Sequence, residues 1–362
     1  MRFRNVLCFG MAAVLVCSNL PANVAQAESL QTKEWTEEMI QERADWELAT
    51  ETMIEEEIKG ADNGSEQETK SGWKYKTLKD GTLEITGYSG KKTSLTLPSK
   101  IGGKKVSSIG KFAFGYSKLK SVKIPGTVKN IEGFAFAYCS SLKSIKIPNG
   151  VTSIGDSAFF FCVNLKSVEL PKTLKKVGNN SFWGTSIKSL TIPKNLTKIG
   201  DYAFRVLRAI KVQNGNPAYC AQDGVLFTKD KKTLIFCPMQ KKGNYTVPRS
   251  VKRIGTYAFY ASALKNIKLQ KGLTTIVNSA FWGSGIKSIV LPEGLKTIGR
   301  NAFNNCNELK SVTIPKSVTK IGENAFGSWS WCVGMGLKLK VVRGSYAQKW
   351  AKTNNIPYSY IK

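Results

Sequence analysis

The stretch IPNGVTSIGDSAFFFCVNLKSVELP, from Ile147 to Pro171, decides the fold, because it begins and ends on an apolar residue followed by proline. The pattern recurs with a period of 22 or 23 residues, interrupted once by a step of 55. In each copy an Ile or Val, usually before glycine, is followed five residues later by Phe. The nine aligned positions are Ile109, Ile131, Ile154, Val177, Ile199, Ile254, Ile276, Ile298 and Ile321. A fixed period of this length predicts coils that stack as a solenoid.

Each copy predicts one coil with an inward and an outward side. In LKSVKIP, from Leu119 to Pro125, alternation places Leu119, Val122 and Ile124 inward and Lys120, Ser121 and Lys123 outward. Proline ends the strand because it lacks a backbone donor. The glycine after the aligned residue is expected to permit the next turn, and the Phe to enter the core. Neighbouring coils must stack, since one coil cannot bury its own apolar face.

The segment IGDSAFFFCVNLKSVELP resembles the BspA-like leucine-rich repeats of bacterial surface and secreted proteins, and the resemblance covers roughly residues 72–362. It implies a right-handed, mostly β, α/β-horseshoe-like solenoid. It also implies a role in adhesion to host proteins, other cells or matrix. Residues 81–110 resemble the entry to such arrays, and residues 344–361 resemble their end.

The chain divides into five predicted parts. Residues 1–27 are typical of a secretory signal peptide, with Ala25-Gln26-Ala27 as its cleavage site; a lipoprotein signal ending at Cys17 is the alternative. An acidic helix and linker (28–72), an N-terminal cap (73–108), the repeat solenoid (109–343) and a C-terminal cap (344–362) follow. We therefore expect a secreted, extracellular chain without a membrane span. This expectation includes a chain that associates with the cell wall after export.

Charge separates these parts. Residues 28–70 hold 14 acidic and 4 basic side chains, whereas residues 71–362 hold 48 basic and 11 acidic ones. Residues 30–59 are expected to form an amphipathic helix with Trp35, Met39, Trp46 and Met53 on one side. This helix is either a solvated spacer or a tethered segment that covers the basic face until displaced.

Two further segments carry predictions of their own. Residues 213–244 contain GVLFTKDKKTLIF, which predicts a β-hairpin inserted between coils, as a spacer or as a loop that contacts a partner. Near the end, Tyr346, Ala347, Trp350 and Ala351 fall on one helical face. That helix is expected to close the open core of the last coil.

Six cysteines follow the signal segment, and their positions in the repeat separate them. Three lie three residues after the repeat Phe and only in the longer coils, which favours small buried thiols; they are Cys139, Cys162 and Cys306. Cys220 and Cys237 flank the inserted hairpin and are the better disulfide candidates, with Cys332 left over.

The composition argues against an enzyme. The chain has no histidine, which removes the commonest general base and metal ligand. Its few carboxylates are spread over the coils, and Asp156, Asp201 and Glu323 share one turn position where they can accept backbone N–H groups. No cysteine group has zinc spacing, so we expect no metal and no cofactor.

The outward strand positions carry the candidate binding residues. A cation occupies the second strand position in eight coils, and a second, partial row follows: Lys120, Lys143, Lys166, Lys188, Arg208, Lys265, Lys287 and Lys310, with Lys123, Lys146, Lys211 and Lys268. This row either keeps an exposed sheet soluble or binds a polyanion such as a wall polymer or an anionic glycan; nucleic acid is disfavoured. Because the resemblance to the BspA-like repeats implies adhesion, we expect a non-enzymatic adhesion protein that binds a protein or glycan partner. The alternative is a wall- or polyanion-associated structural protein.

Overall fold

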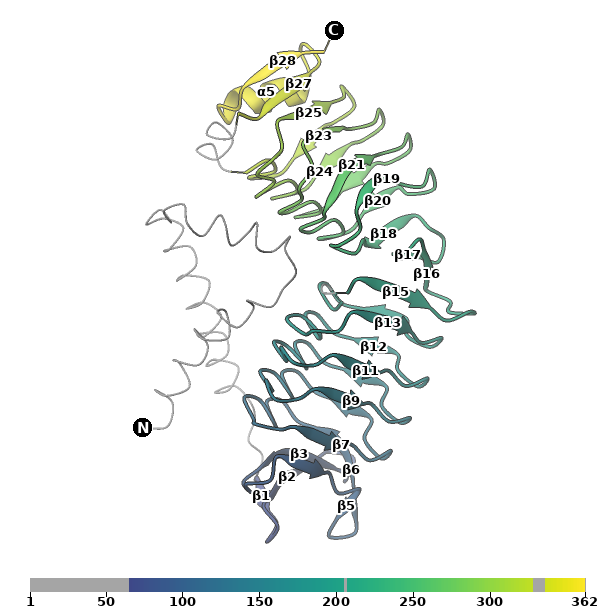
Figure 1. Ribbon diagram of the computed structural model, residues 1–362, viewed down its shortest axis with the longest axis vertical. Helices are drawn as coiled ribbons and strands as arrows, with labels where there is room; N and C mark the ends of the chain where they lie inside the picture. Colours follow the sequence, from purple (N-terminus) through teal and green to yellow (C-terminus); the bar gives the residue numbers. More distant parts are fainter. Residues whose placement is uncertain (1–64, 205–206, 328–335, 362) are drawn as a thin grey trace. The chain divides into compact units, whose positions relative to one another are not determined.

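Two series of short parallel strands run through the repeats (Figure 1). The structure, a computed structural model, describes residues 65–361 except 205–206 and 328–335. The signal segment, the predicted acidic helix and Cys332 lie outside the described residues. The described part is a mostly-β solenoid, and its only helix is α5, Tyr346–Thr353.

The first series, the short-strand ladder, holds the aligned Ile and Val residues. Its strands pair in parallel from coil to coil, with Ile131 opposite Ile154 and Ile154 opposite Val177. They are β8 (Asn130–Ile131), β10 (Ser153–Ile154), β12 (Lys176–Val177), β14 (Lys198–Ile199), β20 (Arg253–Ile254), β22 (Thr275–Ile276), β24 (Thr297–Ile298) and β26 (Lys320–Ile321).

The second series, the strand face, carries the outward lysines. Its strands are β4 (Ser94–Thr96), β7 (Ser121–Lys123), β9 (Ser144–Lys146), β11 (Ser167–Glu169), β13 (Ser189–Ile192), β15 (Ala209–Val212), β19 (Gly243–Thr246), β21 (Leu264–Lys268), β23 (Ser288–Val290), β25 (Ser311–Ile314), β27 (Lys338–Val341) and β28 (Tyr358–Tyr360). They form four separate pairs, β4–β7, β9–β11, β13–β15 and β19–β21, and one four-stranded sheet, β23–β25–β27–β28.

The predicted orientation of each coil is confirmed. Leu119, Val122 and Ile124 are buried, and Lys120 and Lys123 are exposed. The repeat Phe rings stack through the core with centroids 4.8–5.8 Å apart. The α/β-horseshoe comparison is corrected, because turns and two-residue strands, not helices, connect the strand face from coil to coil within the described residues.

The glycine after the aligned residue has a different role from the one expected. A Cβ at Gly155 would lie 2.5 Å from the backbone N of Gly133, and one at Gly299 would lie 2.5 Å from the N of Asn278. These glycines are therefore needed because neighbouring coils approach closely. The left-handed turn falls two residues later, where Asn180 and Asn301 both have φ 54. Asparagine tolerates that conformation better than most residues.

The N-terminal cap begins earlier than the sequence indicated, because part of the expected linker forms a strand. Strands β1 (Gln67–Glu68), β2 (Trp73–Thr77) and β3 (Leu83–Tyr88) are antiparallel. The hairpin β5 (Lys100–Ile101) and β6 (Lys104–Ile109) follows. Strand β6 pairs in parallel with both β3 and β8, so it starts the short-strand ladder.

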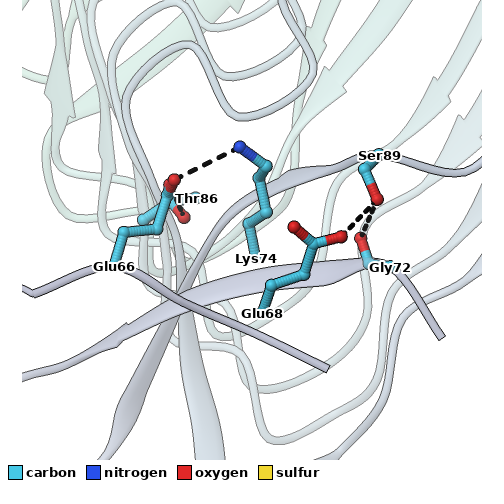
Figure 2. Close-up of polar contacts among 6 residues, drawn as sticks. All are labelled: Glu66, Glu68, Gly72, Lys74, Thr86 and Ser89. Carbon is cyan, nitrogen blue, oxygen red and sulfur yellow. Dashed lines mark hydrogen bonds and ion pairs between the residues drawn. The ribbon is translucent and has the colours of Figure 1, made fainter. Parts of the chain in front are cut away.

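Polar contacts hold the first strand in place (Figure 2). Glu66 accepts a hydrogen bond from Thr86 Oγ1 at 2.5 Å and lies 3.3 Å from Lys74 Nζ. Glu68 accepts one from Ser89 Oγ. The Thr86 hydroxyl and the Lys74 ammonium lower the pKa of Glu66, although partial burial opposes the shift. Two acidic residues of the acidic segment are thus part of the cap.

The inserted segment is a three-stranded antiparallel sheet, and it contains the expected hairpin. Its strands are β16 (Tyr219–Gln222), β17 (Val225–Thr228) and β18 (Thr233–Phe236). Strand β18 then pairs in parallel with β20 and restarts the short-strand ladder. The side chains of Leu226 and Phe227 point into different halves of the core, one running from Leu83 to Leu226 and the other from Val225 to Ile356. The insertion therefore joins two halves of the array.

The three repeat cysteines are buried free thiols, as expected. Each Sγ donates to the carbonyl of the repeat Phe in the preceding coil: Cys139 to Phe114 at 3.1 Å, Cys162 to Phe136 at 3.0 Å, and Cys306 to Phe281 at 3.0 Å. Each of these carbonyls also accepts a backbone N–H, so the thiol adds a second hydrogen bond that links neighbouring coils.

Cys220 and Cys237, the disulfide candidates, are both free thiols in the structure. Cys220 lies in β16, and Cys237 directly follows β18. Strand β17 lies between these two strands, which places them roughly 9.6 Å apart at ordinary strand spacing. A disulfide needs Cα atoms within about 7 Å.

The C-terminal cap forms as predicted, with one correction. In α5, Ala347 and Ala351 are fully buried, and the Trp350 ring lies edge-on to Phe326 at 5.7 Å. Tyr346, which the helical face placed against the core, is instead exposed. Strand β28 follows the helix and pairs with β27, so the last sheet is closed by a strand as well. None of the described helices is long and apolar enough to cross a membrane.

Candidate functional site

All twelve predicted cations of the strand face are exposed. Backbone hydrogen bonds join neighbours of the first row, from Lys166 N to Lys143 O at 2.9 Å and from Arg208 N to Lys188 O at 2.7 Å. These bonds place like charges on adjacent coils, where they repel one another. An anionic partner would reduce that repulsion.

Two acidic residues partly offset this charge. Glu169 lies 3.4 Å from Lys146, and Glu308 lies 3.8 Å from Lys287. All four side chains are mostly exposed, so each ion pair contributes only about 0–1 kcal/mol. The face therefore keeps a strong positive charge.

Cations are not confined to the strand face. A second set of exposed lysines lies beside the short-strand ladder, and its backbone bonds also run from coil to coil. It comprises Lys129, Lys175, Lys252 and Lys296. These residues share one repeat position, two residues before the aligned Ile or Val, which is visible in the sequence. They show that positive charge alone does not define a binding face.

A groove in the strand face does distinguish one region of it. The groove has a volume of about 560 Å³ and is lined by residues of β9, β11, β13 and β15. Val168, Leu170 and Leu190 contribute apolar surface, while Lys146 and Lys211 border it with charge. The structure thus brings two of the predicted site residues to one groove. The other ten lie elsewhere on the strand face.

The groove lies at one of the places where neighbouring strands of the strand face are not paired. Strand β9 pairs with β11 and β13 pairs with β15, but β11 and β13 belong to different sheets. The backbone bond from Ser186 N to Leu165 O, at 3.0 Å, joins the two coils just before the strands diverge. Within the described residues, the facing edges of β11 and β13 therefore present backbone polar groups without a strand partner.

Two core positions are partly exposed at this separation. In the neighbouring coils the equivalents of Val168 are Ile145 and Leu190, which are 4% and 7% exposed, and the equivalent of Leu170 on β9 is Ile147, at 2%. Val168 and Leu170 are only partly buried. The groove consequently combines apolar surface, unpaired strand edges and cationic borders, which are the elements of a binding site for a macromolecule.

The carboxylates of the described residues can be assessed for metal binding and for their predicted turn role. No cluster of three His, Cys, Asp or Glu side chains in the described part of the chain is placed to hold a metal ion. Asp156, one of the shared turn carboxylates, accepts the backbone N–H of Asn179 at 2.8 Å, as its repeat position predicted. At the equivalent position, Glu323 instead lies 3.3 Å from the guanidinium Nε of Arg300.

The comparisons with known proteins agree with this architecture. The family described as BspA type leucine rich repeat region matches residues 88–211 and 235–332, in 6 copies. The solved structure of the pneumococcal vaccine antigen PcpA is similar in fold, with 23% identity and a TM-score of 0.62 over 83% of this chain and 99% of that one. No curated protein matches the chain.

Two further solved structures are similar. A leucine rich cell surface protein from Faecalibacterium prausnitzii has 27% identity and a TM-score of 0.54, covering 81% of this chain and 98% of that one. A leucine-rich repeat protein from Eubacterium ventriosum has 25% identity and a TM-score of 0.53, covering 75% of this chain and 82% of that one.

Proposed function

The chain belongs to the BspA-type leucine-rich-repeat family, and we propose that it is a secreted or cell-surface adhesion protein that binds a protein or glycan partner through its strand face. The observation that carries the proposal is the grooved, cationic strand face, at which Lys146 and Lys211 border exposed apolar surface. The family is a repeat scaffold, and the relative from Faecalibacterium prausnitzii is described as a cell surface protein. We accordingly assign the chain no catalytic role.

The exposed lysine rows support a second function, that of a structural protein held on an anionic wall polymer or glycan. The two functions differ in their response to salt, because screening weakens contacts between exposed charges. Retention by the lysine rows alone falls steeply as salt rises, whereas a protein interface that also buries apolar surface falls less.

The test measures binding of the labelled chain, residues 28–362, to bacterial and epithelial cell surfaces before and after protease treatment, across a salt series. Salt-resistant binding that protease abolishes supports a protein partner. Salt-sensitive binding that survives protease, and that purified wall polymer or heparin competes away, supports an anionic glycan or wall polymer. Absence of binding to either surface, at any salt concentration, would contradict both functions.

Matched variants separate the strand face from charge in general. One variant carries Lys143→Gln, Lys166→Gln, Lys188→Gln and Arg208→Gln. Its control carries Lys129→Gln, Lys175→Gln, Lys252→Gln and Lys296→Gln, which removes the same charge beside the short-strand ladder. We expect the first variant to bind about tenfold more weakly and the control to bind like the parent. An equal loss in both would mean that net charge, not the strand face, drives binding.

A further inference from the structure

The groove between β11 and β13 has features that bear on the kind of partner it fits. Neighbouring strands in a parallel sheet bond to each other along their whole length, so a strand edge without a partner is a template for another strand. Here two such edges face one groove: β11 is bonded only to β9, and β13 only to β15. An extended peptide is the ligand that satisfies both edges with its own backbone groups.

The floor of the groove gives such a peptide an apolar anchor. Val168 and Leu170 occupy positions that the adjacent coils bury, and both are partly exposed here. Successive side chains of a strand point to opposite faces of the sheet. Every second side chain of an added strand therefore meets this apolar floor, and the others point outward from the strand face.

The charged residues at the border of the groove determine which peptide charge binds favourably. Lys146, Lys172 and Lys211 line it and are exposed, and Glu169 is the one acidic side chain among the lining residues. Glu169 already lies 3.4 Å from Lys146, which leaves an excess of positive charge. Outward side chains that are acidic complement this border, whereas basic ones are repelled.

We propose that the groove between β11 and β13 binds an extended acidic peptide segment of a partner protein, which adds as a strand to the edges of β11 and β13. This inference rests on the proposed adhesion function and names the class of ligand for one region of the strand face. The peptide alternates apolar residues, which face Val168 and Leu170, with acidic residues, which face Lys146 and Lys211.

The probe is a fluorescein-labelled octapeptide of alternating Glu and Val residues, measured by fluorescence anisotropy against the chain of residues 28–362. A Lys–Val octapeptide tests charge, and a Glu–Val octapeptide N-methylated at alternate residues tests the backbone bonds, because methylation removes the donors. We expect both comparison peptides to bind at least about tenfold more weakly than the Glu–Val peptide. Equal binding of the N-methylated peptide would overturn strand addition.

A pair of charge-reversal variants locates the site. Lys146→Glu with Lys211→Glu alters the groove, and Lys123→Glu with Lys268→Glu makes the same change on β7 and β21, outside it. All four lysines are exposed, so both variants are expected to fold. We expect about tenfold weaker peptide binding for the first variant and little change for the second. Similar losses in both would overturn the groove as the site.

Amide hydrogen exchange reports backbone hydrogen bonding, which charge attraction alone would not change. Bound peptide should slow amide exchange in residues 166–171 and 188–193, and leave residues 121–124 and 264–269 unchanged. Protection elsewhere would contradict the proposal. If the peptide fails to bind while the chain still binds cell surfaces, the groove inference is wrong and the adhesion function stands. If the chain binds neither the peptide nor any cell surface, both are wrong.

Discussion

The phenol hydroxyl of Tyr219 accepts the backbone N–H of Ile199 at 3.1 Å, at the last strand of the first ladder section. The same hydroxyl donates to the carbonyl of Thr197 at 3.1 Å. A single side chain thus makes the two contacts that the next strand of the ladder would make with β14. Burial also raises the pKa of the Tyr219 phenol, so the group stays neutral and able to donate.

Replacing Tyr219 with Phe should destabilise the chain. The change removes one oxygen and leaves a strand N–H and a carbonyl without their partner, which costs about 1–3 kcal/mol for poorly hydrated groups. Urea unfolding followed by circular dichroism measures the effect. Tyr75→Phe is the control, because the described residues give the Tyr75 hydroxyl no hydrogen bond. If the urea midpoint falls no more for Tyr219→Phe than for Tyr75→Phe, solvent satisfies the Ile199 N–H and the Thr197 carbonyl in the variant, and the prediction is wrong.

Replacing Gly299 with Ala should disturb the stacking of two coils. An added Cβ would lie 2.5 Å from the backbone N of Asn278, so the coils must move apart, at a cost of about 1–3 kcal/mol typical of overpacking. Gly126→Ala is the control, since its Cβ would meet its nearest neighbour, Asn149 O, at an ordinary 3.5 Å. Thermal unfolding of both variants tests this reading. An unchanged melting temperature for Gly299→Ala would refute the close-approach explanation.

Glu132 should make stability depend on pH. Burial, and then the nearby charge of Glu84, raise the pKa of Glu132 above its ordinary value of 4.5. A raised pKa in the folded state gives stability that is fully present below the unfolded pKa and lost as pH rises through the folded pKa. Removing the charge of Glu132 should therefore increase the free energy of unfolding at neutral pH but not at acidic pH.

The variant that tests this is Glu132→Gln. We expect it to be more stable than the parent at neutral pH, and the difference to vanish below about pH 4.5, where the carboxyl is protonated in both states. Glu293→Gln, at an exposed position, is the control. Denaturant titrations at neutral pH and below about pH 4.5 measure this difference. If the parent is more stable than Glu132→Gln at neutral pH, the charged form of Glu132 is stabilising and the prediction is wrong.

Thiol labelling should distinguish the cysteines. Burial raises the pKa of Cys306 to about 12, and that of Cys237 likewise to about 12, so few thiolates form near pH 8. Cys220 is partly exposed. We expect N-ethylmaleimide to modify Cys220 in the native chain, and Cys237 and Cys306 only after unfolding. Peptide mapping by mass spectrometry reads each site, and rapid native labelling of Cys306 would mean that its coil opens.

The repeat made most of the coil predictable. Alternation around Val122 gave the inward and outward positions, and the link between Cys162 and the longer turn predicted a buried thiol. Both predictions are correct because equivalent positions of every coil pack in the same environment. The role of the repeat glycine was not predictable, since only the distance from Gly155 to the preceding coil separates close approach from a left-handed turn.

The groove could not be read from the sequence. The turn between Phe159 and Leu165 is one residue longer than the turn between Phe182 and Ile187, and β11 and β13 separate there. The same one-residue difference occurs between the turns before β23 and β25, yet those strands stay paired. Strand separation therefore depends on packing across several coils. The lysine rows, in contrast, are visible in the sequence, and so is the row that includes Lys129 and Lys175.

The coil-to-coil contacts also bear on how such a chain can evolve. Cys162 contacts Phe136 and Cys139 of the preceding coil, and Ile154 pairs with the coils on either side. Unequal recombination that duplicates or deletes one whole coil would recreate the same kinds of contact at the new junction. The segment from Tyr219 to Phe236 has no second copy, so a deletion across it would leave the two core halves unjoined. The number of coils can thus change on either side of the segment from Tyr219 to Phe236, whereas that segment itself must be kept.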